Sequence, residues 1–207
     1  MNKDMITIID YDVANLGSIS NMLNRIGIKT NITSDFNIIS ESKNLILPGV
    51  GSFLAAMKII KKLKIDIAIN NSLKNNGRLL GICLGMQLLF ESSEEGNCEG
   101  LKLISGKVNK FPQVKNYKVP HMGWNKVDFK DGSPMNFNSN DGSEKKFYFA
   151  NSYYVKCKDE SNIVGTTKYI FNFTSAVQKD NIFGVQFHPE KSHIYGISLF
   201  KNFYNVK

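Results

Sequence analysis

The sequence lacks the features that define several classes of protein. Its 207 residues include only three cysteines, an odd number without a CxxC pair, which excludes a disulfide-stapled miniprotein and argues against a structural zinc site. Apolar runs stay well short of the roughly 20 residues that span a bilayer, and residues 1–4 lead straight into a strand-like segment rather than a signal peptide. We therefore expect a cytoplasmic protein with no metal, no cofactor and no membrane contact.

Arginine is also scarce. Only Arg25 and Arg78 occur among the 26 basic residues, although the formal net charge is +8. Proteins that read nucleic acid or clamp phosphate rely on the bidentate fork of arginine, and here the lysines are scattered along the chain. The sequence therefore argues against a nucleic-acid partner.

Strand-like and helix-like segments alternate over the first ninety residues. The predicted strands are short apolar runs, and the predicted helices carry apolar residues at helical spacing. We expect strands at residues 5–9, 29–32, 45–47 and 78–82, and helices at residues 15–26, 52–63, 65–75 and 85–90. This alternation predicts a parallel sheet flanked by helices.

After residue 106 the pattern changes to short strand-like pieces separated by turn residues. We expect strands at residues 125–129, 146–149, 153–157, 162–167, 173–178 and 182–187, a polar loop at residues 130–145 and a closing helix at residues 194–203. The predicted fold is therefore α/β, with a mostly parallel, helix-flanked central sheet and additional antiparallel strands. A hydrophobic content of 42% over this length suits one domain, so we expect residues 1–207 to share one core.

Cys83 is the strongest candidate nucleophile. It stands where a buried strand meets a helix, in the segment GICLG at residues 81–85, which is the cysteine version of a nucleophile elbow. The flanking glycines are needed where a Cβ would clash, and the helix start favours the reactive thiolate form. A buried structural cysteine is the alternative interpretation, and we apply it to Cys98 and Cys157, which lack this context.

His188 is the candidate base, and Glu190 is its candidate orienting group. They belong to the segment HPE, which follows the strand predicted at residues 182–187. Residues two positions apart in an extended chain point to the same side, so both side chains can face one pocket. Catalytic groups gather at the carboxyl ends of parallel strands, and Cys83 and His188 both lie just beyond such an end. The sequence therefore predicts a thiolate, an imidazole and a carboxylate acting together.

A thiolate that attacks a carbonyl also needs donors for the oxyanion. The segment PGVG at residues 48–51 ends a predicted strand near the elbow, and its glycines allow backbone N–H groups to turn into a pocket. We therefore expect donors among Gly49, Val50 and Gly51, together with the N–H of Leu84.

Two motifs make the sequence resemble the class I (triad) glutamine amidotransferases. That family is marked by a GxCxGxQ elbow and a distant HPE, and here these read GICLGMQ at residues 81–87 and HPE at residues 188–190. The segments PGVGSF at 48–53, VPHMGWN at 119–125 and HPEKS at 188–192 extend the resemblance nearly end to end. The resemblance implies a flavodoxin-like fold and a triad of Cys83, His188 and Glu190.

The resemblance also implies a substrate. Cys83 would attack the side-chain amide of glutamine and release ammonia, with hydrolysis of the thioester giving glutamate. Gln87 and the backbone of Ser152 and Tyr153 resemble the positions that hold glutamine.

A partner is implied as well. The ammonia would pass into a separate cyclase subunit of the (β/α)8 type, in a heterodimer of histidine biosynthesis that forms imidazole glycerol phosphate and aminoimidazole carboxamide ribotide. His121, Met122, Trp124 and Asn125 resemble an interface loop facing that partner, with a plain hydrophobic turn as the alternative interpretation.

One departure from the family pattern leaves the ammonia acceptor open. Family members commonly read FVHSY where this chain has FANSY at residues 149–153, so Asn151 replaces a histidine. A paralogous glutaminase that supplies ammonia for amidine formation on a nucleotide sugar is therefore an alternative. A stand-alone cysteine hydrolase of the same fold is a further alternative, but it would not explain the VPHMGWN segment. A non-catalytic thiol sensor is another, but it would not explain the intact HPE segment.

Overall fold

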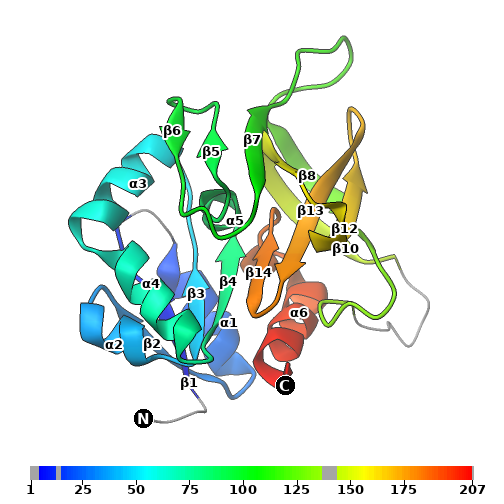
Figure 1. The fold of residues 1–207 in the computed structure, drawn as a ribbon. Coiled ribbons are helices and arrows are strands. Elements are labelled where there is room, and N and C mark those ends of the chain that lie inside the picture. The colour runs from blue at the N-terminus through cyan, green and yellow to red at the C-terminus, as the bar shows by residue number, and fades with distance from the viewer. Residues whose placement is uncertain (1–4, 13–14, 137–143, 207) are drawn as a thin grey trace.

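The computed structural model describes residues 5–12, 15–136 and 144–206, so part of the predicted loop, residues 137–143, lies outside the described residues. A sheet of twelve strands runs through the described part of the chain (Figure 1). Its main path, in spatial order, is β2 (Lys29–Thr33), β1 (Met5–Ile9), β3 (Asn44–Leu47), β4 (Arg78–Ile82), β14 (Ile182–Val185), β13 (Asn172–Lys179), β11 (Tyr153–Cys157), β7 (Gly106–Lys110), β5 (Ser92–Ser93) and β6 (Cys98–Glu99). The α/β class predicted from the sequence is confirmed.

The sheet changes character at β14. Strands β1 to β4 pair in parallel, and β14 pairs in parallel with β4 but antiparallel with β13. Beyond it, β12 (Ile163–Lys168) pairs antiparallel with β13 and with β9 (Asp128–Phe129), next to the short 3-10 helix Glu160–Asn162. A separate antiparallel pair, β8 (His121–Lys126) and β10 (Lys146–Asn151), lies beside them. The mostly antiparallel pairing expected of the second half is confirmed.

Helices cover both faces of the parallel strands. Apolar residues of α1 (Leu16–Arg25) and α6 (His193–Asn205) belong to one buried cluster, and those of α2 (Phe36–Glu41), α3 (Phe53–Lys62), α4 (Ile65–Lys74) and α5 (Leu84–Leu88) belong to another. In β1, Ile8 enters the first cluster and Ile9 the second. An unbroken apolar strand is therefore buried on both sides, as the sequence predicted. Among the described residues, no helix has the length and apolar character needed to cross a membrane.

Local signals placed most of the first-half helices correctly. The side chain of Asn15 accepts the N–H of Ser18 at the start of α1, and Ser52 accepts the N–H of Ala55 at the start of α3. Gly27, at φ +82°, follows α1 in the left-handed region where glycine is unstrained.

Several elements differ from the expectations. Helix α2 and strands β5, β6 and β7 were not predicted, because the first three are short and β7 alternates between buried and exposed lysine-rich positions. The strand expected at residues 125–129 is two strands, β8 and β9, and β8 begins four residues earlier. Strand β14 ends at Val185, two residues before the predicted end.

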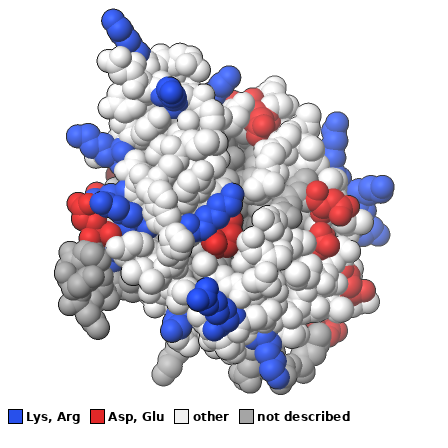
Figure 2. Space-filling view, turned by 180° about the vertical axis from the view of Figure 1, so that it is seen from behind, with Lys and Arg blue, Asp and Glu red and all other residues white. Residues whose placement is uncertain are grey.

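Charged side chains are dispersed over the surface. Figure 2 shows lysine and arginine side chains spread among uncharged residues on one face, with acidic side chains between them. The excess of positive charge in the sequence therefore forms no continuous basic stripe on that face.

Candidate active site

The candidate site lies at the carboxyl ends of two neighbouring parallel strands. Cys83 follows β4, His188 lies three residues beyond β14, and the two strands pair with Ile82 opposite Val185. The N–H of Cys83 donates to the carbonyl of Val185 at 2.8 Å. The pairing register of the sheet therefore places Cys83 and His188 close together beyond the ends of β4 and β14.

Cys83 occupies a strained turn between β4 and α5. Its φ of +54° and ψ of −110° are unusual for a residue with a side chain. A Cβ on Gly81 would lie 2.6 Å from the carbonyl oxygen of Gly85, and a Cβ on Gly85 would lie 1.8 Å from the carbonyl oxygen of Leu47. Both glycines are therefore required by close backbone contacts, and this close packing allows the turn that presents the sulfur.

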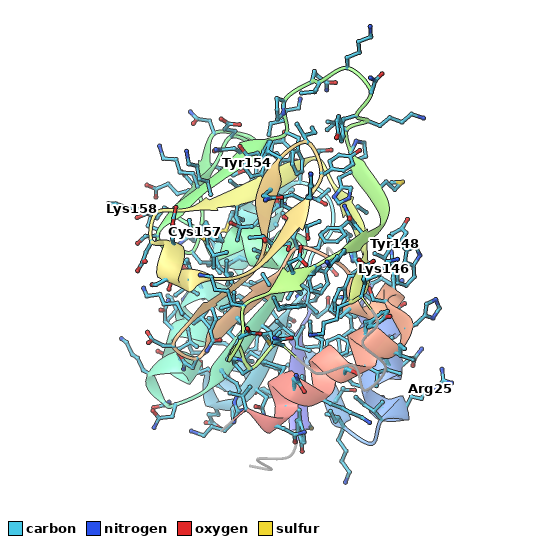
Figure 3. All side chains as sticks on the ribbon, turned by 90° about the vertical axis from the view of Figure 1, so that its right-hand side faces the viewer. Arg25, Lys146, Tyr148, Tyr154, Cys157 and Lys158 are labelled. Atoms are coloured by element: carbon cyan, nitrogen blue, oxygen red, sulfur yellow. The ribbon has the colours of Figure 1, made fainter. Side chains whose placement is uncertain are left out.

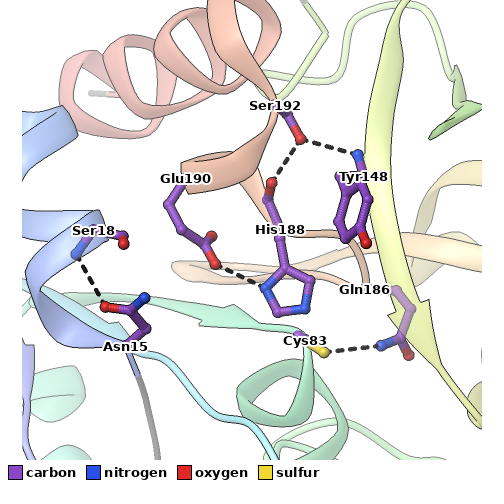
Figure 4. A network of polar contacts seen from close by, with 8 residues as sticks. All are labelled: Asn15, Ser18, Cys83, Tyr148, Gln186, His188, Glu190 and Ser192. Atoms are coloured by element: carbon purple, nitrogen blue, oxygen red, sulfur yellow. Dashed lines mark hydrogen bonds and ion pairs between the residues drawn. The ribbon is translucent and has the colours of Figure 1, made fainter. Parts of the chain in front are cut away.

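His188 and Glu190 form a buried pair beside this turn. The Nδ1–H of His188 donates to Oε1 of Glu190 at 2.8 Å, with side chains 4% and 5% exposed. Figure 4 shows the imidazole between the carboxylate and Cys83. Burial alone lowers the pKa of His188, but its hydrogen bonds and electrostatic interactions with Cys83 and Glu190 outweigh burial and raise this pKa to about 10. The imidazole is therefore cationic at neutral pH.

The expected oxyanion donor Leu84 is occupied in this structure. Its N–H donates to the carbonyl oxygen of Gly49 at 3.3 Å, so its role as an oxyanion donor stays a prediction. The cause is the orientation of the peptide after Gly49, which presents its carbonyl to Leu84. Just before it, the carbonyl of Pro48 accepts a hydrogen bond from the buried hydroxyl of Tyr11.

A cavity of about 290 Å³ opens onto Cys83. The predicted residues that line it are Val50, Gly51, Cys83, Leu84, Gln87, Ser152, Tyr153 and His188. Asn151, noted as a departure from the family pattern, also lines it, as do Glu95, Ala150 and Lys191, which were not predicted. Gly49 and Glu190 are not among the lining residues.

Gln87, which lines the cavity, belongs to a network of side-chain amides. Its Nε2 donates to Oε1 of Gln186 at 3.0 Å and to the carbonyl of Tyr153 at 3.3 Å, and Nε2 of Gln186 lies 3.8 Å from the sulfur of Cys83. Asn151 also donates to the Tyr153 carbonyl, at 2.9 Å. Gln87 and Asn151 therefore fix the backbone at Tyr153 from two sides.

Glu95 is an acidic group of the cavity that the sequence did not indicate. Its Oε2 accepts the N–H of Phe53 at 3.0 Å, at the start of α3, while the residue lines the cavity. Glu95 lies within an acid-rich stretch at residues 91–95, and no motif spacing distinguishes it from its neighbours. Only the folded backbone shows which of these carboxylates reaches the cavity.

The four predicted interface residues are in strand β8 rather than in a loop. Because side chains alternate along a strand, Met122 and Trp124 are 65% and 48% exposed, whereas His121 is only 3% exposed. The side-chain amide of Asn125 donates to the His121 ring and to the carbonyl of Lys168. The expectation of an interface loop is therefore corrected, and the exposed part is Met122 and Trp124.

His121 is enclosed by aromatic rings. Its ring stacks on Phe149 at 4.7 Å and on Tyr169 at 4.0 Å between centroids, and Phe173 meets it edge-on. Burial lowers its pKa to about 4, so it is neutral at physiological pH. It is a packing residue of the β8 and β10 pair.

The other two cysteines lie outside this arrangement. Cys157 is on β11, and Figure 3 shows it on the opposite side of the molecule from Tyr148, which stands beside His188 in Figure 4. Burial raises the pKa of Cys157 to about 12. Cys98 is half-buried on β6, and its thiol donates to the carbonyl of Glu99. Neither thiol shares the setting of Cys83.

Known proteins share both the family pattern and the fold of this chain. The model of the family "Glutamine amidotransferase class-I" matches residues 7–206. PurLQS from Thermotoga maritima has a TM-score of 0.76 at 17% identity over 99% of both chains. A glutamine amidotransferase from the same organism has a TM-score of 0.64 at 17% identity, over 98% of this chain and 84% of the other. These structures show a shared fold.

The chain belongs to the class-I glutamine amidotransferase family and is a glutamine amidotransferase. Its sequence is 52% identical to imidazole glycerol phosphate synthase subunit HisH 2 of Methanococcus maripaludis, over 96% of this chain and 98% of the relative. It is 47% identical to subunit HisH of Sulfurimonas denitrificans, over 96% and 97%. Within the family it belongs with the HisH subunits, and the resemblance drawn from the two motifs is confirmed.

Proposed function

We propose that this chain is the glutaminase subunit of an imidazole glycerol phosphate synthase. It hydrolyses glutamine to glutamate and passes the ammonia to a cyclase subunit, which forms imidazole glycerol phosphate and aminoimidazole carboxamide ribotide in histidine biosynthesis. The observation that carries the proposal is the buried His188–Glu190 pair facing the Cys83 turn at one cavity. The names of the HisH relatives support the choice of pathway.

The triad divides the reaction into two steps. The sulfur of Cys83 attacks the side-chain amide carbon of glutamine, and His188, already cationic, gives its proton to the departing ammonia. Water, deprotonated by the now neutral imidazole, then cleaves the thioester to glutamate. Glu190 keeps the ring oriented and stabilises its positive charge.

The rest of the cavity recognises the amino-acid end of glutamine. The carboxylate of Glu95 complements the α-ammonium group, because it is the acidic side chain lining the cavity. Backbone groups of Ser152 and Tyr153 face the substrate, and Gln87 and Asn151 hold that backbone in place through the Tyr153 carbonyl.

The oxyanion site forms only after a local rearrangement. While the Gly49 carbonyl occupies the N–H of Leu84, that donor cannot stabilise a tetrahedral intermediate. Rotation of the peptide between Gly49 and Val50 would free Leu84 and turn the Val50 N–H toward the cavity. The isolated chain is therefore a poor glutaminase, and a bound partner that favours the rotated peptide activates it.

The partner is a (β/α)8 cyclase that forms a heterodimer with this chain in the cytoplasm. The surface of this chain that binds the cyclase includes Met122 and Trp124, which are exposed. It also includes Lys191, which lines the cavity and lies over the ring of Tyr148. A surface that continues into the cavity suits ammonia transfer, because free ammonia is protonated in bulk water and loses its nucleophilicity.

The proposal is tested by measuring glutamine hydrolysis by the purified chain alone and with a histidine-pathway cyclase and its nucleotide ligand. We expect slow turnover alone, at least tenfold faster turnover in the complex, and none for Cys83→Ser. A glutamine-mimicking alkylator should label Cys83 and leave Cys157 unmodified at neutral pH. Equal turnover with and without any cyclase would contradict the proposal and favour a stand-alone hydrolase.

A second candidate acceptor is a nucleotide sugar, whose amidine would be formed by a cyclase-like partner. Asn151 favours this candidate, because the family commonly has histidine there, although in the structure Asn151 supports the glutamine side of the cavity. Activation by a sugar-pathway cyclase, and not by a histidine-pathway cyclase, would establish it.

A further inference from the structure

The backbone of His188 is attached to strand β10 at two points. Its N–H donates to the carbonyl of Tyr148 at 2.8 Å. Its carbonyl accepts the hydroxyl of Ser192 at 2.6 Å, and the same hydroxyl oxygen accepts the N–H of Tyr148 at 3.0 Å (Figure 4). Tyr148 and His188 thus form an antiparallel bridge with one direct backbone hydrogen bond, and the Ser192 hydroxyl links the other pair of backbone groups.

The geometry of the chain explains why a side chain is needed here. After His188 the chain enters the 3-10 helix Pro189–Lys191 and turns away from β10, so a second direct backbone bond to Tyr148 is replaced by the serine. The Ser192 side chain is fully buried, and the residue connects this 3-10 helix to α6, where its carbonyl accepts the N–H of Gly196. Its hydroxyl has both hydrogen-bonding roles filled by backbone groups, so it is fixed in one rotamer.

An imidazole that serves a buried triad must be held within a fraction of an ångström of its working position. Glu190 holds the far side of the ring through Nδ1, but Glu190 lies on the same short 3-10 helix as the chain leaving His188. A carboxylate on that segment cannot by itself fix the distance from the ring to Cys83, because ring and carboxylate can shift together. Attachment to β10, a separate strand, supplies the fixed reference.

We propose that Ser192 is a positioning residue that anchors His188 to β10 and so sets the imidazole against the sulfur of Cys83. This inference rests on the proposed glutaminase function of the triad. Ser192 does not line the cavity, so its hydroxyl acts on the reaction through His188 and leaves glutamine binding unchanged.

Ser192→Ala tests the anchor, with Ser198→Ala as the matched control. Ser198 lies on α6, and its hydroxyl donates to the carbonyl of Ile194, one turn back in the same helix. For Ser192→Ala we expect kcat for glutamine to fall about tenfold, the amount that one lost buried hydrogen bond in the transition state supplies, with KM within about twofold. For Ser198→Ala both constants should stay at their original values.

A second readout depends on the sulfur and needs neither glutamine nor a partner. Iodoacetamide alkylates the sulfur of Cys83, and its rate depends on how the imidazole is held beside that sulfur. The rate at pH 7 should fall several-fold in Ser192→Ala and stay unchanged in Ser198→Ala. All rates are expressed per folded molecule, with the folded fraction taken from circular dichroism.

If folded Ser192→Ala has the same kcat and the same alkylation rate as the wild type, the proposal that Ser192 anchors His188 is wrong. A raised KM with an unchanged alkylation rate would also overturn it, because the serine would then act on the cavity. If the wild-type chain hydrolyses no glutamine with any cyclase, the proposed function fails, and the alkylation rates still decide whether Ser192 positions His188.

Discussion

The backbone N–H of Leu84 donates to the carbonyl oxygen of Gly49 at 3.3 Å, so the N–H proposed to bind an oxyanion is already hydrogen-bonded. The N–H of Leu84 is thus hydrogen-bonded to the PGVG turn at residues 48–51, which was itself expected to supply oxyanion donors. The bond is long and its acceptor belongs to a glycine-containing segment, so its exchange for a bond to substrate costs little. On the proposed function, the activity of this chain therefore depends on the orientation of one peptide group next to Cys83.

Gly49→Ala tests the space that this peptide group needs. A Cβ there would lie 2.7 Å from the hydroxyl oxygen of Tyr11 and 3.0 Å from Cβ of Leu84. We expect the free energy of unfolding to fall by about 1–3 kcal/mol and kcat to fall in the complex, because the crowded peptide cannot rotate. Urea unfolding and stimulated glutaminase assays measure both. Gly17→Ala, whose Cβ would have no neighbour nearer than 4.0 Å, should preserve both properties.

Glu95→Gln tests recognition of the α-ammonium group. The amide keeps an oxygen for the N–H of Phe53 but removes the negative charge from the cavity. We expect KM for glutamine to rise about tenfold or more, since charge-assisted bonds are about twice as strong as neutral ones, with a smaller change in kcat. Steady-state kinetics measure this. Glu94→Gln is the control, because Glu94 accepts the N–H of Lys110 away from the cavity, and an equal rise in that variant would contradict the assignment.

The buried His121 ring should make the free energy of unfolding depend on pH. Its pKa is about 4 in the folded chain and about 6.5 when unfolded, so between these values the unfolded state binds more protons. The free energy of unfolding therefore falls as pH falls from about 6.5 toward 4, with His121 contributing a loss on the order of 1 kcal/mol at pH 5.

The measurement is chemical unfolding at pH 7 and pH 5. His121→Phe should lose less stability than the wild type over this interval, because its ring cannot take a proton. His193→Gln, at an exposed position, should lose as much as the wild type. The same loss in all three proteins would show that carboxyl groups, rather than His121, dominate the acid response.

Trp124→Ala tests the docking surface. The ring is 48% exposed, stacks on His193 and meets Tyr148 edge-on, so it is a preformed aromatic anchor. We expect the Kd for the cyclase to rise at least tenfold, measured by titration calorimetry. Ile67→Ala removes a side chain that is equally exposed but lies on α4, and it should leave the Kd unchanged. A similar Kd for Trp124→Ala and the wild type would place docking elsewhere.

Much of the fold was predictable because its signals are local. Strands β1, β3 and β4 are apolar runs long enough to be recognised alone, and the caps at Asn15 and Ser52 mark helix starts. The segments GICLG and HPE indicated a triad because each is a recognisable pattern of five residues or fewer. Their convergence was expected from the rule that parallel strands end at one edge.

The remainder depended on tertiary contacts that no short segment encodes. Strands β5 and β6 are two residues long and exist only through pairing with each other and, for β5, with β7. The strand at His121 to Lys126 was hard to recognise, because its apolar side chains, Met122 and Trp124, are exposed and its one buried residue is a histidine. The cavity position of Glu95 follows from the start of α3, 42 residues earlier in the chain.

Strand β14 lies between β4 and β13 and joins the two kinds of sheet. The chain that precedes residue 111 contributes the sulfur, and the chain that follows residue 120 contributes the imidazole and the carboxylate. On the proposed mechanism, two fragments divided between these points would each be inactive, and they could act only after β14 had paired with β4 in register. Hydrolysis of glutamine would thus report directly that the two halves of the chain have assembled through the β4–β14 pairing.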